Sequence, residues 1–461
     1  MQVGDSDPER DQVPKVRGTS VAGQAGGMKI AVFLDHDIVI RHFVLSGVLE
    51  PLRKAHDVSF WFPHKHRRVR LDLNSLHVSP FHTLNVDEQR AFRQRRLYQA
   101  TVLRNSRWGN ERELQKRMWR SMLGRRGYWE TWSLSMPGAY QAFRAWSRAM
   151  IGEAHNLSDA LYYLKPDLIL HPTALEGLFV DDLARLGRKR GIKTVFIMNS
   201  WDNPSTKAMI SEHPDKLIVW GEHSEKDAIR HMKTPPESII RLGAAQYDVY
   251  RKPPKVSPQE WRARLSIGNN TRVLLYAGSN QGLNETEHLR LLDEGIEGGR
   301  LPNTTVVYRP HPWRPYPAEE KDFFAMRFKH VRMDPSSQAS YLQSRGSGRV
   351  MVELADYEDT HSTLNAVDAV ISPLSSILLE AALHGKTVAA YVRGMEIRHF
   401  YWTFFERVPC FKIEAEDRIV GACARMLGPR AAHASARELS YFVEPSDRPW
   451  GERLLETINA L

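Results

Sequence analysis

The chain has 461 residues, 42% hydrophobic and 26% charged, a balance typical of a soluble globular protein with two or more domains. No apolar run reaches the roughly 18 to 20 residues that span a bilayer, and two cysteines are too few for a disulfide framework or a cysteine-rich metal site. The net charge is +10, and segment 64–130 alone carries an excess of ten, with sixteen Lys or Arg against six Asp or Glu.

Residues 1–27 lack the apolar centre of a secretory signal, so we expect a disordered leader and a fold that starts near Met28. From there short apolar runs alternate with helical stretches, which is typical of a parallel sheet covered on both faces. The runs are "KIAVFLD", "DVSFWFP", "PDLILHP", "IKTVFIMN" and "DKLIVWG". This pattern predicts a first Rossmann-like domain over 28–245, interrupted by a basic helical insertion at about 87–164.

Prolines and charges in "RLGAAQYDVYRKPPKVSP" predict a linker, after which the strand–helix rhythm restarts. We expect a second Rossmann-like domain over 246–445 and a C-terminal helix within 446–461. The predicted fold class is therefore α/β, with two facing domains. Ligands of open parallel sheets lie beyond the carboxyl ends of the strands, so the chemistry is expected in the cleft between the domains.

One strand of the second domain ends in "VVYRPHPWRP", where prolines flank a histidine. Arg309 offers a planar fork for phosphate oxygens, and the two prolines restrict the backbone that carries His311. Such a pair at a strand end points to half of a phosphate site.

A second segment, "SPLSSILLEAALHGK", places Ser375 and Ser376 at the start of an apolar helix. Hydroxyls and free amides there can cap the helix or bind a phosphate. Glu380, about one turn further, could accept hydrogen bonds from a ribose; alternatively it is solvated and the serines only cap the helix. A third polar loop contains Gly278, Ser279 and Asn280. Together the three loops predict a cradle for the phosphates of a nucleotide.

The order of the His311–Pro312 pair and the Ser375–Ser376 pair resembles the HP and SS motifs of bacterial sialyltransferases. Related patterns occur in polysialyltransferases and in the glycerophosphotransferases that build teichoic acids. The resemblance implies a GT-B fold and a grip on the phosphate of a cytidine nucleotide donor. A further segment, "NSWDNPSTKAMISEHPDKLIVWGEHSEKDAIRH" with "RLGAAQYDVY", is similar to a stretch of little-characterised bacterial GT-B glycosyltransferases. The resemblance extends over about 28–461 without the insertion.

The loops after the first-domain strands supply candidate acceptor residues. After the first strand, "LDHDIVIRHF" should bring His36, Asp37, Arg41 and His42 to the cleft, although Asp37 could instead cap a helix and Arg41 could be solvated.

The loop "NSWDNPSTK" also follows a strand, and there Trp201 could stack on a sugar while Asp202 and Asn203 bind hydroxyls. A proline-terminated turn with local side-chain contacts is the alternative interpretation of this loop.

An inverting transfer needs a base that takes the proton of the acceptor hydroxyl. Our candidates are Asp202 and Asp35, then Glu176. The last lies in "LEG", one acid short of the acidic-acidic-Gly motif of sialyltransferases. Asp35, His36 and Asp37 do not make a convincing metal site, so we expect no metal and no cofactor besides the nucleotide-sugar substrate.

The sequence therefore predicts a metal-independent glycosyltransferase that uses a CMP-, UDP- or similar sugar donor and a surface polysaccharide, glycolipid or glycoprotein acceptor. A CDP-polyol phosphotransferase and a non-catalytic protein that binds polyanions or membranes are the alternatives. A hydrolysing sugar-nucleotide epimerase fits less well, because it calls for an acidic pair where the two serines stand. The basic region 64–130 could contact an anionic membrane or be a solvated helical face; no nucleic-acid motif accompanies it. We expect a cytoplasmic protein, peripheral on the inner membrane.

Overall fold

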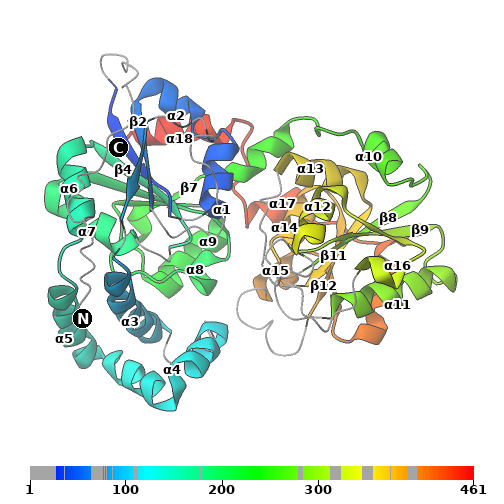
Figure 1. Ribbon diagram of the computed structural model, residues 1–461, viewed down its shortest axis with the longest axis horizontal. Helices are drawn as coiled ribbons and strands as arrows, with labels where there is room; N and C mark the ends of the chain where they lie inside the picture. The colour runs from blue at the N-terminus through cyan, green and yellow to red at the C-terminus, as the bar shows by residue number, and fades with distance from the viewer. Residues whose placement is uncertain are drawn as a thin grey trace, which may run out of the picture.

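The computed structural model describes residues 27–35, 37–63, 76, 78, 80–85, 87–106, 113–175, 179–278, 284–311, 323–344, 357–373, 375–392 and 402–461. It contains two domains, each built on a parallel sheet with helices around it, which face one another across a central cleft region (Figure 1). The predicted α/β fold of two facing Rossmann-like domains is confirmed.

The first domain is a seven-stranded parallel sheet in the order β3-β2-β1-β4-β5-β6-β7. Its strands are β1 (Lys29–Phe33), β2 (Asp57–Pro63), β3 (Phe81–Leu84), β4 (Leu168–Thr173), β5 (Lys193–Met198), β6 (Lys216–Val219) and β7 (Ile239–Arg241). Ile30 of β1 is in register with Val58 of β2 on one side and with Leu168 of β4 on the other. The strand order reverses at β1, which is where a parallel sheet opens a crevice for ligands.

Helices cover both faces of this sheet, and each face has its own apolar cluster. The helices are α1 (Asp37–Ile40), η1 (Arg41–Leu45), α2 (Glu50–Ala55), α7 (Val180–Arg190), α8 (Asn203–Thr206), α9 (Glu222–Asp227), η3 (Ala228–Met232) and η4 (Pro236–Ser238). Burial on both faces explains why the strands read as continuous apolar runs in the sequence.

The predicted helical insertion is confirmed between β3 and β4. It consists of α3 (Glu88–Asn105), α4 (Glu113–Leu134), α5 (Pro137–Ile151) and α6 (His155–Leu164). Figure 1 shows α4 and α5 at the lower edge of the first domain, where they extend away from its sheet. No helix within the described ranges is long and apolar enough to cross a membrane.

The second domain has six parallel strands in the order β10-β9-β8-β11-β12-β13. These are β8 (Arg272–Ala277), β9 (Thr304–Arg309), β10 (Val331–Met333), β11 (Ala369–Pro373), β12 (Thr387–Tyr391) and β13 (Cys410–Ile413). The helices are α10 (Pro258–Arg264), α11 (Glu285–Glu297), η6 (Phe323–Met326), α12 (Pro335–Ser344), α13 (Tyr357–Ala366), α14 (Ile377–Leu383), α15 (Trp402–Arg407), η8 (Glu416–Arg418), α16 (Ile419–Met426) and α17 (Ala436–Ser440).

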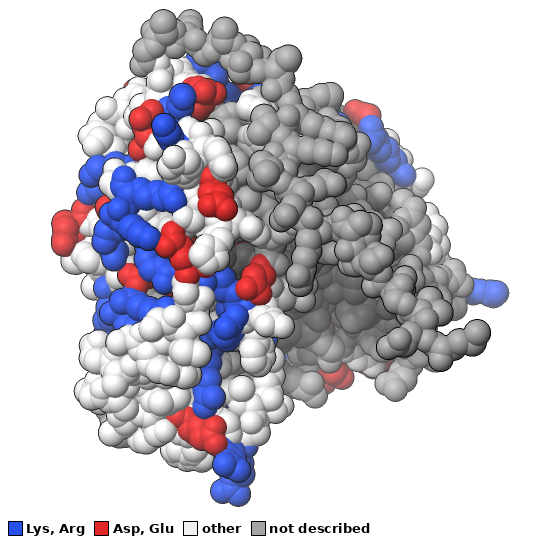
Figure 2. All heavy atoms as spheres, turned by 60° about the vertical axis from the view of Figure 1, so that its left-hand side comes forward, with Lys and Arg blue, Asp and Glu red and all other residues white. Residues whose placement is uncertain are grey.

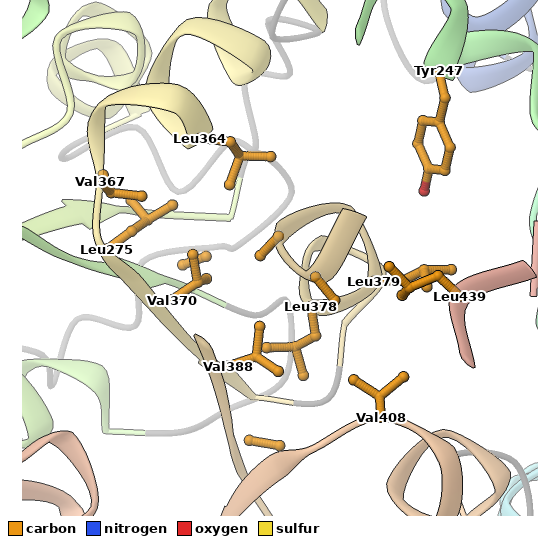
Figure 3. Close-up of a cluster of buried hydrophobic side chains, with 14 of the residues drawn as sticks. Tyr247, Leu275, Leu364, Val367, Val370, Leu378, Leu379, Val388, Val408 and Leu439 are labelled. Atoms are coloured by element: carbon orange, nitrogen blue, oxygen red, sulfur yellow. The ribbon is translucent and has the colours of Figure 1, made fainter. Parts of the chain in front are cut away.

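The core of the second domain fixes α14 on the sheet. Leu378 and Leu379 of this helix are fully buried in a cluster that also contains Val370 of β11 and Val388 of β12 (Figure 3). Because these leucines cannot turn without leaving the core, the serines that precede the helix are held at the carboxyl end of β11.

The chain passes between the domains twice, and the two connecting segments are bonded to each other. The outgoing segment contains η5 (Ala245–Arg251), and the returning one leads into α18 (Trp450–Asn459), which packs on α2 of the first domain (Figure 1). The Asp248 carboxylate accepts a hydrogen bond from the Trp450 amide at 2.5 Å, and the Arg251 guanidinium donates to the carbonyl oxygen of Ser446 at 2.6 Å. The predicted C-terminal helix thus belongs to the core of the first domain.

Candidate functional site

A cavity of about 320 Å³ lies between the two domains, beyond the carboxyl ends of their strands. The first domain lines it with Ile38, Arg41, His42, Asn199, Ser200, Asn203, Lys207, Trp220 and Gln246 of the adjoining segment. The second domain lines it with Ala277, Gly278, Arg309, Pro310, His311, Tyr357, Thr360, Ser375, Ser376, Ile377 and Glu380. Ligand sites of doubly wound sheets are found at this kind of position.

Nine of the residues singled out in the sequence line this one cavity: Gly278, Arg309, His311, Ser375, Ser376, Glu380, Arg41, His42 and Asn203. The second-domain members meet because β9 and β11 flank β8, so three loops that are far apart in the sequence leave the sheet side by side. Their roles toward a ligand stay predictions. Four other candidates, Ser279, Asn280, Pro312 and Glu176, lie outside the described residues, as does His36. Asp37 begins α1, and its side chain is also outside them.

Arg309 ends β9 with its guanidinium held from two sides. One terminal nitrogen donates to the Thr360 hydroxyl at 3.0 Å, and Nε lies 3.7 Å from a carboxylate oxygen of the buried Asp334. These contacts fix the plane of the guanidinium group before a ligand binds. The side chain therefore loses less conformational entropy when it binds a phosphate. His311, two residues later, is half-buried at the same rim.

The Ser375–Ser376 pair precedes α14, but the Ser376 side chain does not cap this helix. Within the described part of the chain, Ser376 occupies the N-cap position and its hydroxyl makes no capping hydrogen bond. The interpretation of the serines as simple helix caps is therefore not what the geometry favours. Both residues are half-buried and line the cavity.

Glu380 lines the cavity from the first turn of α14, so the alternative of a solvated carboxylate is wrong, and its predicted contact with a ribose stays a prediction. Its side chain is buried, and the Tyr250 hydroxyl donates to it at 2.7 Å. Burial raises the pKa of Glu380, while the Tyr250 hydrogen bond and the charges of Arg41 and Arg309 partly counteract that rise. The carboxyl group lines the cavity, where it can accept hydrogen bonds from a ligand.

A π-helical turn, η1, presents Arg41 and His42 on the first-domain side. Such turns are rare, and many occur at functional sites. The Arg41 guanidinium lies 3.8 Å from the ring centroid of Tyr357, which belongs to the second domain, and the His42 ring lies 5.4 Å from the same ring. Arg41 is thus a contact between the domains rather than the solvated side chain that the sequence left open.

Asp202, a leading candidate for the base, serves the local turn instead. Its carboxylate accepts hydrogen bonds from the Ser200 hydroxyl at 2.5 Å and the Thr206 hydroxyl at 3.2 Å, and the residue is not among those that line the cavity. Asn203 does line the cavity and donates to the side-chain oxygen of Asn199. The proline-terminated turn was therefore the better interpretation of this loop.

Trp201 was expected to stack on a sugar, and this expectation is wrong. The side chain is only 1% exposed and packs against Phe442 and His223, with ring centroids 5.3 and 5.2 Å away. An aromatic residue after a buried strand looks the same in a sequence whether it faces a ligand or the core, and here the returning segment of the chain covers it.

Asp35, the other leading candidate for the base, is buried and is not among the residues that line the cavity. One of its oxygens lies 3.5 Å from the Thr173 hydroxyl and 3.8 Å from Nε2 of His171. The His171 Nδ1 hydrogen-bonds to the carbonyl oxygen of Phe33 at 2.8 Å, and burial lowers the pKa of this histidine to about 4. The imidazole is therefore neutral at neutral pH, and the contact with Asp35 is not an ion pair there.

The low pKa of His171 predicts a loss of stability in mild acid. In the unfolded chain the imidazole gains a proton below about pH 6.5, but the folded state resists protonation down to a pKa of about 4. Stability attributable to His171 is thus fully present above pH 6.5 and falls by about 3 kcal/mol as the pH drops to 4. Urea unfolding of the native protein and of His171→Gln at several pH values measures the difference.

The quantity to compare is the difference in free energy of unfolding between the native protein and His171→Gln. The curve of the native protein alone is not enough, because Asp181 changes the stability with pH in the opposite direction. Burial raises the pKa of Asp181 to about 7, so its contribution grows as the pH falls. That contribution is common to both proteins and cancels in the comparison. Parallel stability–pH curves for the native protein and His171→Gln would contradict the assignment.

Several residues that sequence reasoning missed complete the cavity or its support, namely Asn199, Lys207, Gln246, Tyr250, Tyr357 and Thr360. Tyr250 and Gln246 lie in the segment that the sequence predicts only as a linker. A signal was available there, because two tyrosines and a glutamine are unusual in a solvated linker of this kind. The metal and cofactor expectations stay predictions.

No protein-family model and no curated protein matches the sequence. Three of the solved structures that resemble the fold are UDP-N-acetylglucosamine 2-epimerases. The enzymes from Methanocaldococcus jannaschii, in complex with UDP-GlcNAc and UDP, and Neisseria meningitidis, bound to UDP-GlcNAc, each have 12% identity and a TM-score of 0.53, with 94% of this chain and 100% of the other covered. The enzyme from Rickettsia bellii has the same identity, TM-score and coverage of this chain, with 96% of its own length covered. At this identity the likeness shows the GT-B fold.

Proposed function

We propose that this protein is a glycosyltransferase that moves a sugar from a nucleotide-activated donor to a glycan, glycolipid or glycoprotein acceptor of the cell surface. The main support for this proposal is that four predicted donor-binding residues line one cavity between two Rossmann-like domains. They are Arg309, His311, Ser375 and Ser376. Two of the solved structures of this fold hold UDP-GlcNAc, which supports a nucleotide-sugar as the donor. We place the reaction at the cytoplasmic face of the membrane and expect no metal requirement.

On the donor side, the leaving group of such a transfer is a nucleotide phosphate. Negative charge grows on that phosphate as the sugar–oxygen bond breaks, and groups positioned in advance stabilise it. In this proposal Arg309 and His311 bind the phosphate oxygens together with the two serine hydroxyls. Glu380 accepts hydrogen bonds from the ribose, as the sequence suggested.

On the acceptor side, a base must remove the proton of the attacking hydroxyl. With Asp202 and Asp35 away from the described cavity lining, we assign this role to His42. The hydroxyl oxygen bonds to the anomeric carbon, the bond from that carbon to the donor phosphate breaks, and the hydroxyl proton passes to the imidazole. Asn203 and Lys207 are positioned to bind acceptor hydroxyls.

A nucleotide panel tests the proposal. The melting temperature of the protein should rise with the concentration of at least one of CMP, CDP, UDP, GDP and dTDP, since a ligand of the folded state alone stabilises it. His311→Ala should weaken that nucleotide about 10-fold to 100-fold, because a charge-assisted hydrogen bond is lost. His433→Ala is the matched control, a histidine of the same domain that is remote from the cavity lining. Equal affinities of the two variants would refute the site.

A hydrolysing sugar-nucleotide epimerase is the second candidate, favoured by Glu380, a buried carboxyl group in the cavity whose pKa is raised by burial, and by the epimerases of similar fold. Incubation with the identified donor separates the two. An epimerase turns the donor over without any acceptor, whereas a transferase requires one. Stabilisation by CDP, with transfer of a phosphate along with the polyol, would instead identify the CDP-polyol phosphotransferase.

A further inference from the structure

The helical insertion exposes an unusual amount of apolar surface. The described residues contain thirteen exposed large hydrophobic side chains, and nine of them lie in this insertion. They are Phe92, Met122, Leu123, Trp129, Met136, Trp146, Met150, Tyr162 and Tyr163. Clustering of this kind in one structural element indicates an interaction surface rather than the scattered exposure that any soluble protein has.

The most prominent part is a bend within α4, which we call the α4 elbow and define as residues 121–129. Gly124 interrupts the helix with φ 67° and ψ 172°, and a side chain added there would meet nothing within 4 Å. Six consecutive residues, 121–126, are exposed. Exposure over more than a full helical turn means that no other described part of the chain covers residues 121–126, while Tyr128 on the inner side is buried.

The elbow combines apolar and cationic side chains. Met122 and Trp129 are 57% and 55% exposed, and the Arg126 side chain is 95% exposed. The Glu130 carboxylate is shared by Arg126 and Arg96, whose nitrogens lie 3.0 and 3.1 Å from its two oxygens. These three side chains carry a net positive charge, since one carboxylate faces two guanidinium groups.

The inner side of the elbow is firmly held, so the exposed side chains are presented by a rigid support. Trp129 meets the ring of Trp132 at 5.4 Å, and Trp132 packs on a cluster that joins α4 to α3 through Trp119 and Leu103.

Figure 2, turned toward the side of the insertion, shows Lys and Arg side chains gathered over the first domain.

We propose that the α4 elbow docks on an anionic lipid bilayer. Arginine forks bind lipid phosphates, tryptophan prefers the boundary between headgroups and acyl chains, and Met122 with Leu123 can enter the apolar layer. The charge complementarity favours an anionic surface, and the mixture of protruding apolar and cationic groups favours a bilayer over a folded protein partner. This inference rests on the proposed function for its acceptor class: docking would bring a membrane-bound acceptor to the cavity.

Vesicle sedimentation with the full chain tests the docking surface. We expect binding to vesicles of phosphatidylcholine with about 30% phosphatidylglycerol and much weaker binding to phosphatidylcholine alone. Binding should also weaken in 0.5 M salt, because the attraction of Arg to anionic headgroups is screened. Arg125→Ala with Arg126→Ala should reduce the partition coefficient about 25-fold, at about fivefold for each arginine.

Two matched variants control for general charge and apolarity. Arg300→Ala with Arg430→Ala removes two exposed arginines of the second domain, and Leu342→Ala removes an apolar side chain that is 44% exposed there. The arginine control should bind vesicles as the native protein does. Met122→Ala with Trp129→Ala should bind at least about tenfold more weakly than Leu342→Ala, provided that circular dichroism shows both folded.

Two outcomes would overturn the proposal. If the elbow variants bind anionic vesicles as tightly as their controls, the α4 elbow is not the docking surface. A native protein that ignores anionic vesicles and forms dimers that Trp129→Ala dissociates would show that a second copy covers the elbow. The nucleotide-dependent rise in melting temperature should be unchanged in every elbow variant, so failure here is distinguishable from failure of the proposed function.

Discussion

Replacing His42 with alanine is expected to lower kcat about 10²-fold to 10⁴-fold, the usual contribution of a positioned general base. The donor dissociation constant should change less than about threefold, because His42 lies on the first-domain side of the cavity, opposite the predicted phosphate groups. Steady-state kinetics and calorimetric binding, both with a sugar donor of the nucleotide that the panel identifies, measure the two effects.

A purely structural role for His42 predicts a different pattern. The ring contacts Tyr357 across the domain boundary, so its loss could disturb the cavity as a whole. In that case donor affinity and melting temperature would fall together with kcat, and added imidazole would not restore turnover. Recovery of activity with imidazole, and loss of the acidic limb of the kcat–pH profile, would identify a proton acceptor. His155→Ala, at an exposed site in the same domain, should leave kcat unchanged.

Replacing Arg90 with alanine should lower the free energy of unfolding of the first domain by about 3 kcal/mol, the lower end of the cost of breaking a buried ion pair from one side, because Arg185 and Gln94 still bind Asp182. Two nitrogens of the Arg90 guanidinium meet the two oxygens of Asp182 at 3.1 and 2.5 Å, and the third donates to the carbonyl oxygen of Gly152 at 2.9 Å. Arg90 is 7% and Asp182 3% exposed. One side chain thereby joins the start of α3, the end of α5 and the start of α7.

Urea unfolding followed by hydrogen exchange over residues 88–164 measures the effect. Arg90→Lys should recover only part of the loss, because an ammonium group cannot reproduce the planar fork that meets both oxygens. Arg93→Ala, one turn away on the exposed side of α3, should change the free energy by less than about 0.5 kcal/mol. If Arg90→Ala and Arg93→Ala were equally stable, the pair would contribute little to the attachment of the insertion.

The fold and the donor half of the candidate site were accessible from the sequence for one reason. Strands buried on both faces leave long apolar runs, and in a parallel sheet every carboxyl end lies at the same edge. Arg309 and Ser375 are 66 positions apart in the chain, yet they leave neighbouring parts of that edge. Their convergence needed only the order of elements and not their detailed packing.

The acceptor half was less accessible because it depends on packing between distant segments. A π-helical turn at Arg41 has no recognisable sequence pattern, and its contact with Tyr357 joins residues more than 300 positions apart. Trp201 and Asp202 followed a strand, as a ligand-binding pair would, but residues near Phe442 cover the tryptophan and local hydroxyls occupy the carboxylate. Only the tertiary structure separates those alternatives.

The bonded pair of connecting segments has a mechanical consequence for the cleft. Because the two connecting segments are bonded to each other through Asp248 and Arg251, we expect the second domain to rotate about the line through them more readily than it slides or twists. Such a rotation would close the cavity between the domains and expel solvent from it, while the residues on its two sides keep their alignment.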